Sequence, residues 1–428
     1  MHDGDINFLL RLSEHRNGYT REDAVKRLGA LGNPIALPRL IARANDWVAP
    51  IRIAAKEAIV KLATTDNAAA FVTNLPALYH LHRCGRDDHR DLISLVEHYL
   101  ASHPQPLVQG IKHTQRHVAR ACLSLVIRHK LLGPADIINL GLRQVDLMLR
   151  LTVSSLLKTL AGSVQNTAAE LAIKDPFMPV RRAAFQCLLK HQMEDDMIKK
   201  HLFDRHSTIR LMAIEAMQLR NFNVALTYEN MLTTSSILKL RCALWGVGEL
   251  KHTACIPRIE QCLTNSPYAS VRKQSLTSLA GLLGASFEHR IDGFLSDSSP
   301  AVCREAARLC VQSGIGLTAD RLTDITRQSR HSHVSSVCFY LAKKTNKWES
   351  LIFLLALSNS KNRQPWIRDT QLAEGIRHWN HNFNKNSTRP TAGQIKALQK
   401  NMQNIAYALN TPRFRTILFT LKIYGIAL

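Results

Sequence analysis

The sequence predicts an all-α protein: an α-solenoid of about twelve HEAT-like helical pairs with a C-terminal helical cap. Two observations predict this class, a motif that returns at a nearly constant period and an amphipathic-helix pattern inside each copy. Length agrees with them, since 428 residues with 46% hydrophobic content exceed the usual size of one compact core. A repeat array accounts for the length and the period together.

The period is carried by arginines. Neighbouring copies are 29 to 32 residues apart in the series Arg120, Arg150, Arg181, Arg210, Arg241, Arg272 and Arg304. The spacing continues upstream through Arg90, Arg52 and Arg21, with one longer gap of 38 residues between Arg52 and Arg90. Downstream, Ser335 occupies the next position in place of an arginine, and Arg368 follows. A period near 31 residues holds two helices and two turns, which is typical of helical-repeat proteins.

Each copy contains one face of an amphipathic helix, because apolar residues precede the arginine and return three to four and six to seven positions later. The intervening stretches supply the other helix of the pair, as in ALPRLI at 36–41 and CIPRI at 255–259. Gly29 and Gly248 precede these stretches, and we interpret them as turn residues before a helix that begins with proline.

These patterns divide the chain into three parts. Residues 1–380 form the repeat array, with an irregular, longer repeat near 60–95. Residues 381–394 are polar and turn-rich and predict a loop. Residues 395–428 predict a basic helical cap, which a solenoid needs over its last apolar face.

Aspartates precede several of the arginines by six or seven residues. Such an aspartate can accept backbone N–H groups at the start of its helix, and the arginine can pair with it or with its neighbour in the next repeat. We therefore expect a structural ladder between repeats formed by Asp46, Arg52, Asp175, Arg181, Asp204, Arg210, Asp297 and Arg304.

The Asp-x5-Arg spacing, the Val-Arg-x-x-Ala-like helices and the stretch REDAVKRLGALGNPIALPRL resemble HEAT repeats of the short, phycobilin-lyase-like subtype. The resemblance covers roughly residues 20 to 375. It implies an α-solenoid whose second helices line a concave side. It implies little about function, because such repeats serve lyases, glycosylases, transport factors and scaffolds alike.

Arginines that lack a preceding aspartate are the candidates for free charges facing a partner. Two of the predicted helices carry a second basic residue directly after the arginine, namely Arg182 and Lys273. Together these residues predict a basic concave surface of Arg120, Arg150, Arg182, Arg241, Arg272 and Lys273. Residues 375–428 contain no acid, which predicts a second partner-binding group of Lys396, Lys400, Arg413 and Arg415.

The net charge of +23 favours an acidic partner. We expect a non-catalytic scaffold that binds an acidic protein. The alternative is a nucleic-acid-binding solenoid, including a DNA-glycosylase-like base-processing enzyme. Enzyme motifs such as a P-loop, HExxH or a nucleophile elbow do not occur in the sequence, so we favour a role without catalysis or cofactors.

Weaker patterns in the sequence bear on metal binding and on the cellular location of the protein. Four residues in the longer repeat, His80, His82, Cys84 and His89, offer nitrogen and sulfur ligands. Their spacing matches no standard zinc signature, so we expect an irregular loop without metal. The acidic start and the absence of a long apolar run predict a cytoplasmic protein without a transmembrane segment, monomeric when unbound.

Overall fold

The computed structural model describes residues 3–191, 193–358, 364–385, 387–403 and 412–426. Within these ranges the secondary structure is helical, without strands, which confirms the all-α solenoid. Helix packing divides the chain into two compact units, residues 1–198 with 206–212 and residues 199–205 with 213–428. None of the described helices has the length and apolarity needed to cross a membrane.

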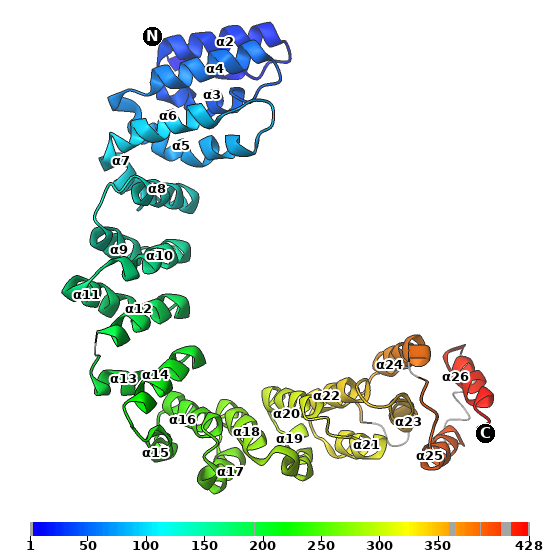
Figure 1. Ribbon diagram of the computed structural model, residues 1–428. Helices are drawn as coiled ribbons and strands as arrows, with labels where there is room; N and C mark the ends of the chain where they lie inside the picture. Colours follow the sequence, from blue (N-terminus) through cyan, green and yellow to red (C-terminus); the bar gives the residue numbers. More distant parts are fainter. Residues whose placement is uncertain (1–2, 192, 359–363, 386, 404–411, 427–428) are drawn as a thin grey trace. The chain divides into compact units, whose positions relative to one another are not determined.

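Unit 1 consists of two layers of helices (Figure 1). The even-numbered layer contains α2 (Gly18–Leu31), α4 (Ala49–Leu62), α6 (Arg90–Ala101), α8 (Arg116–Arg128), α10 (Leu147–Ser154) and α12 (Met178–Lys190). The odd-numbered layer contains α1 (Asp3–Leu12), α3 (Leu37–Arg43), α5 (Ala68–His80), α7 (Pro104–Gly110), α9 (Pro134–Leu142) and α11 (Gly162–Ala172). Each odd helix packs on the even helix that follows it, from α1 and α2 to α11 and α12, as helical-pair repeats require.

Unit 2 has the same two layers (Figure 1). Its even helices are α16 (Ile237–Glu249), α18 (Ala269–Leu283), α20 (Pro300–Gln312), α22 (Ser332–Ala342), α24 (Asp369–Asn382) and α26 (Pro412–Ile423). Its odd helices are α15 (Val224–Asn230), α17 (Ile256–Asn265), α19 (Asp292–Leu295), α21 (Ala319–Gln328), α23 (Lys347–Ser358) and α25 (Ala392–Gln403). The division between the units falls within α13 (Asp195–His201) and α14 (Ser207–Leu219).

Short 3-10 helices complete many of the turns. They are η1 (Pro34–Ala36), η2 (Thr65–Asn67), η3 (Leu81–Arg83), η4 (Ser155–Thr159), η5 (Met231–Thr233), η6 (Thr253–Cys255), η7 (Gly284–Arg290) and η9 (Phe383–Lys385). The core lies between the two layers, where Leu28 of α2, Leu40 of α3 and Ile59 of α4 are fully buried. Burial of such side chains is the main favourable contribution to folding.

Gly29 and Gly248 do not form turns, so this part of the sequence interpretation is wrong. Both lie inside even-numbered helices, in α2 and α16. A Cβ atom added to Gly29 would lie 2.6 Å from Cβ of Ala58 in α4, and one added to Gly248 would lie 2.9 Å from Cβ of Ser278 in α18. These glycines let neighbouring even-numbered helices approach closely.

The polar segment 381–394 is partly helical. α24 continues to Asn382 and η9 follows at Phe383–Lys385, so the irregular part begins after Lys385. The indole N–H of Trp348 donates to the carbonyl oxygen of Thr388 at 2.9 Å, which attaches this part to α23. Beyond it, α25 packs on α23 and α26 packs on α24, so the two layers continue through the segment predicted as a cap.

Candidate partner-binding groove

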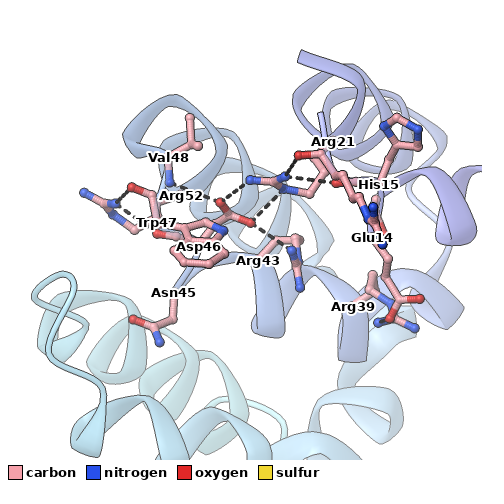
Figure 2. A network of polar contacts seen from close by, with 12 residues as sticks. Glu14, His15, Arg21, Arg39, Arg43, Asn45, Asp46, Trp47, Val48 and Arg52 are labelled. Atoms are coloured by element: carbon pink, nitrogen blue, oxygen red, sulfur yellow. Dashed lines mark hydrogen bonds and ion pairs between the residues drawn. The ribbon is translucent and has the colours of Figure 1, made fainter. Parts of the chain in front are cut away.

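The arginines form ion pairs between successive repeats. Figure 2 shows the first of them, in which Arg21 of α2 reaches Asp46 in the turn before α4. Arg21 donates through Nε at 3.1 Å and Nη2 at 2.9 Å, Arg43 donates at 2.8 Å, and the backbone N–H of Val48 donates at 3.1 Å. Burial alone would raise the pKa of Asp46, but these hydrogen bonds and charges hold its pKa below the ordinary value.

The same arrangement recurs along the chain. An arginine at the fourth position of an even-numbered helix donates through Nη1 to the carbonyl groups six and five residues before it, as Arg150 does to Gln144 and Val145. Its remaining N–H groups bind the aspartate of the following repeat. These pairs are Arg21 with Asp46, Arg150 with Asp175, and Arg272 with Asp297.

The other predicted members of the structural ladder make different contacts. Arg52 donates to the carbonyl oxygens of Asp46 and Trp47 and pairs with Asp87 in the longer repeat. Arg181 is buried and donates to the carbonyl oxygens of Asp175 and Pro176. Arg210 is buried and Asp204 is half-buried.

The expectation that Arg120, Arg150 and Arg272 are free charges is therefore wrong. Arg120 binds Asp146 at 2.8 Å, Arg150 binds Asp175 at 2.8 Å, and Arg272 binds Asp297 at 2.8 Å. The physical reason is that each ladder pair joins two repeats, so an aspartate earlier in the arginine's own repeat is not required.

Lys273 is also paired, although more loosely. It is exposed, and its Nζ lies 3.5 Å from Oε2 of Glu305. Arg182 of α12 and Arg241 of α16 are exposed as expected, and among the described residues no ion pair is found for either side chain.

The prediction that Arg304 belongs to the structural ladder is wrong. The helix α20 begins at Pro300, so its fourth position is Cys303 and Arg304 follows at the fifth. Cys303 is buried and its thiol donates to the carbonyl oxygen of Asp297 at 3.1 Å, in place of an arginine. Arg304 is exposed, and no ion pair or hydrogen bond of its side chain is found in the described part of the chain. The sequence signal of this shift is the separation of seven residues between Asp297 and Arg304, against six in the other predicted pairs.

Arg304 lies at a groove between α20 and α22, with a volume of about 550 Å³. The helix α20 lines it with Pro300, Arg304, Ala307 and Arg308, and α22 lines it with His333, Ser336, Val337 and Tyr340. Tyr340 is 46% exposed, so a ligand in the groove can contact both a cation and an aromatic side chain. We call this set of residues the α20–α22 groove.

Charge in the α20–α22 groove is arranged unevenly. Arg308 donates through Nε to Glu305 at 3.1 Å, so this guanidinium is partly neutralised. Burial opposes ionisation of Glu305, but its hydrogen bonds to Arg308 and Thr277 hold its pKa below the ordinary value. The imidazole Nε2 of His333 contacts the carbonyl oxygen of Asp297 at 3.0 Å. Arg304 thus supplies the available donors for an anionic ligand.

The predicted C-terminal basic group is only partly described. Lys396 and Lys400 of α25 and Arg415 of α26 are exposed, whereas the side chain of Arg413 lies outside the described residues. The structure does not join these residues to the α20–α22 groove.

The structure does not gather His80, His82, Cys84 and His89 into a metal site. His80 ends α5, His82 lies in η3, and the thiol of Cys84 contacts the carbonyl oxygen of His80 at 3.6 Å. His89 is 3% exposed, and neither of its ring nitrogens has a hydrogen-bond partner. Among the described residues, no three of these donors lie close enough together to share an ion.

Comparisons with known proteins show only distant likeness. No protein-family model matches the sequence, and no curated protein matches it. A solved structure of Kap95p binding RanGDP is 14% identical, covering 99% of this chain and 70% of that chain with a TM-score of 0.37. Importin beta crystallised in ammonium sulfate is 13% identical, covering 94% and 64% with a TM-score of 0.36.

A Kap121p mutant is 13% identical and covers 99% of this chain and 47% of that chain, with a TM-score of 0.26. This chain thus spans 47% to 70% of the length of these structures. At TM-scores this low, the assignment of the fold rests on the helix packing of the chain itself.

Proposed function

We propose that this protein is a non-catalytic scaffold that binds an acidic segment of another protein in the α20–α22 groove. The observation that carries the proposal is the exposed side chain of Arg304, which has no ion-pair partner among the described residues and lines the groove together with the exposed Tyr340. A planar guanidinium binds a carboxylate through two parallel N–H groups. Tyr340 and the apolar residues Pro300, Ala307 and Val337, which also line the groove, suit the aliphatic part of an acidic peptide.

The pairing of the ladder supports a protein partner over nucleic acid. A solenoid that follows a phosphate backbone needs many free cations in a row, because each neutralised phosphate adds to affinity. Here Arg120, Arg150 and Arg272 are engaged by aspartates. The row of cations is thereby interrupted, whereas a single groove suits a peptide. Nucleic-acid binding and base processing remain the alternative, and the phycobilin-lyase-like subtype remains a prediction.

The proposal is tested by titrating the full chain with a labelled oligoglutamate peptide and, separately, with a labelled DNA duplex, using fluorescence anisotropy. Arg304→Glu should weaken peptide binding by about tenfold or more, because the variant places a carboxylate where a cation is needed. Arg304→Lys should retain part of the affinity. Arg258→Glu, an exposed position in the odd-numbered helix α17, makes the same change in net charge and should leave binding unaltered.

Two results would contradict the proposal. One is equal weakening by Arg258→Glu, which would show that overall charge and not the groove attracts the peptide. The other is tight, strongly salt-dependent binding of the DNA duplex with no binding of the peptide, which would establish the nucleic-acid alternative.

A further inference from the structure

A second cluster in unit 2 lies outside the α20–α22 groove. It consists of Glu229, His252 and Cys255, whose potential ligand atoms all lie within 4.8 Å of one another. It is the one such group among the described residues. We propose that these three side chains form a zinc-binding site that joins two successive repeats.

Local backbone geometry places two of the three ligands. The helix α16 ends at Glu249, and Lys251, two residues beyond it, has a positive φ of 54°. The backbone N–H of His252 donates to the carbonyl oxygen of Val247 at 2.9 Å, which fixes the chain at this turn. His252 then precedes η6, and Cys255 ends it. This short turn brings the imidazole and the thiol to the same side, with their ligand atoms within 4.8 Å of each other.

The third ligand comes from the preceding repeat. Glu229 lies near the end of α15, and its Oε2 is 2.9 Å from Nε2 of His252. The thiol of Cys255 is buried, whereas the side chains of His252 and Glu229 are 28% and 42% exposed. The cluster therefore has a buried sulfur at its base and an entry path from solvent through the carboxylate.

The chemistry of the three donors fits zinc. Zinc accepts thiolate, imidazole and carboxylate ligands together, at about 2.3 Å from sulfur and about 2.0–2.2 Å from nitrogen and oxygen. These bond lengths place tetrahedral ligands about 3.3–3.7 Å apart. The ligand atoms now lie 2.9 to 4.8 Å apart, so small movements of the partly exposed Glu229 and His252 side chains bring the three donors to these distances. A water molecule can occupy the fourth position.

Zinc must replace the proton of the Cys255 thiol when it binds. Burial, with a further contribution from Glu229, raises the pKa of the Cys255 thiol to about 11, so the thiol is protonated in the absence of metal. Zinc binding forms the Zn–S bond and releases that proton to solvent. The result would be a crosslink between α15 and the turn that leads into α17.

The site is tested with metal-free full-length protein titrated with Co²⁺, which substitutes for zinc and gives a thiolate-to-cobalt absorption band. The wild-type chain should show the band with tetrahedral visible absorption, and Zn²⁺ should displace it at one equivalent. Cys255→Ser should abolish the band, while His252→Asn and Glu229→Gln should each weaken zinc binding by more than about tenfold, the lower limit seen for outer-shell groups of metal sites.

Cys262→Ser is the matched control, because Cys262 is a half-buried cysteine in the adjacent helix α17. It should keep both the cobalt band and the zinc affinity. Circular dichroism checks that the variants fold. If Cys255→Ser does not fold, Glu229→Gln still tests the site, because it changes only a partly exposed side chain. At the same concentration, zinc should also raise the melting temperature of the wild type more than that of His252→Asn. An absent band in the wild type, or one that persists in Cys255→Ser, overturns the site.

Discussion

Arginines at two adjacent positions of the even-numbered helices have different roles. At the fourth position, Arg21, Arg150 and Arg272 bind backbone carbonyls of their own turn and the aspartate of the next repeat. At the fifth position the helical rotation of about 100° moves the side chain away from that turn. Arg241 and Arg304 occupy this position and are exposed.

Arg120 is also at the fifth position, yet it is paired. Its aspartate, Asp146, lies 26 residues later, one more than in the other pairs. Asp146 lies four residues before Arg150, whereas Asp46 and Asp175 lie six residues before Arg52 and Arg181. The aspartate is thus displaced by two residues and the arginine by one, and they still meet. Arg241 has no acid at the corresponding place, because Ser266 and Pro267 occupy it.

His89 provides a prediction about pH. Its imidazole is buried beside Lys56, Arg52, Asp87 and Asp88; burial lowers its pKa below the ordinary value of 6.5, and Lys56 lowers it further. Between pH 6.5 and the lower folded-state pKa, the unfolded chain binds a proton at this residue and the folded chain does not. Stability should therefore fall as the pH drops below 6.5.

Thermal unfolding of the wild type and of His89→Gln, followed by circular dichroism at a series of pH values, measures this contribution. The melting temperature of the variant should fall less steeply between pH 6.5 and about 5. His117→Gln, an exposed histidine of α8, should retain the wild-type slope. If all three proteins show the same slope, His89 does not control the acid sensitivity.

At the scale of the helices, close packing in the even-numbered layer depends on small residues. α2 and α4 approach at Gly29 and Ala58, and α16 and α18 approach at Gly248 and Ser278. The hydroxyl of Ser278 donates to the carbonyl oxygen of Leu244 at 2.8 Å, which adds a polar contact to the close approach. Composition alone cannot distinguish these glycines from turn glycines.

Gly29→Ala should destabilise unit 1, because the added methyl group would lie 2.6 Å from Cβ of Ala58 and 3.3 Å from its Cα. Overpacking of this kind costs about 1–3 kcal/mol. Gly281→Ala is the control: it is an exposed glycine of α18, and its added Cβ would meet only Nζ of Lys251 at 3.8 Å. That substitution should stabilise the helix by about 0.5–1 kcal/mol. Melting temperatures that fall in both variants would contradict the distinction.

At the scale of the whole molecule, the array has few contacts between repeats distant in sequence, since each helix packs on its neighbours. Stability in such arrays is a sum of local terms. The loss of one ion pair between repeats should therefore destabilise only the helices next to it.

Asp297→Asn tests this locality in unit 2. It removes the partner of Arg272, and the two side chains are only 11% and 12% exposed, so the loss should be about 3 kcal/mol. Hydrogen exchange should accelerate in α18 and α20 and change little in α24. Glu374→Gln breaks the exposed pair with Lys343 and should cost at most about 0.5 kcal/mol. Uniform acceleration throughout unit 2 would show one cooperative body instead.

The sequence by itself determined the fold class and the repeat length, because hydrophobic periodicity and the spacing of the arginines are local properties that each copy carries. It also identified Asp46, Asp175 and Asp297. Which arginines remain available was decided only by the tertiary structure. A pairing between repeats cannot be read inside one repeat, and a one-residue shift rotates a helical side chain to another face, as it does for Arg304 beside Cys303. The zinc-ligand candidates Glu229, His252 and Cys255 meet for the same reason, since two repeats contribute them.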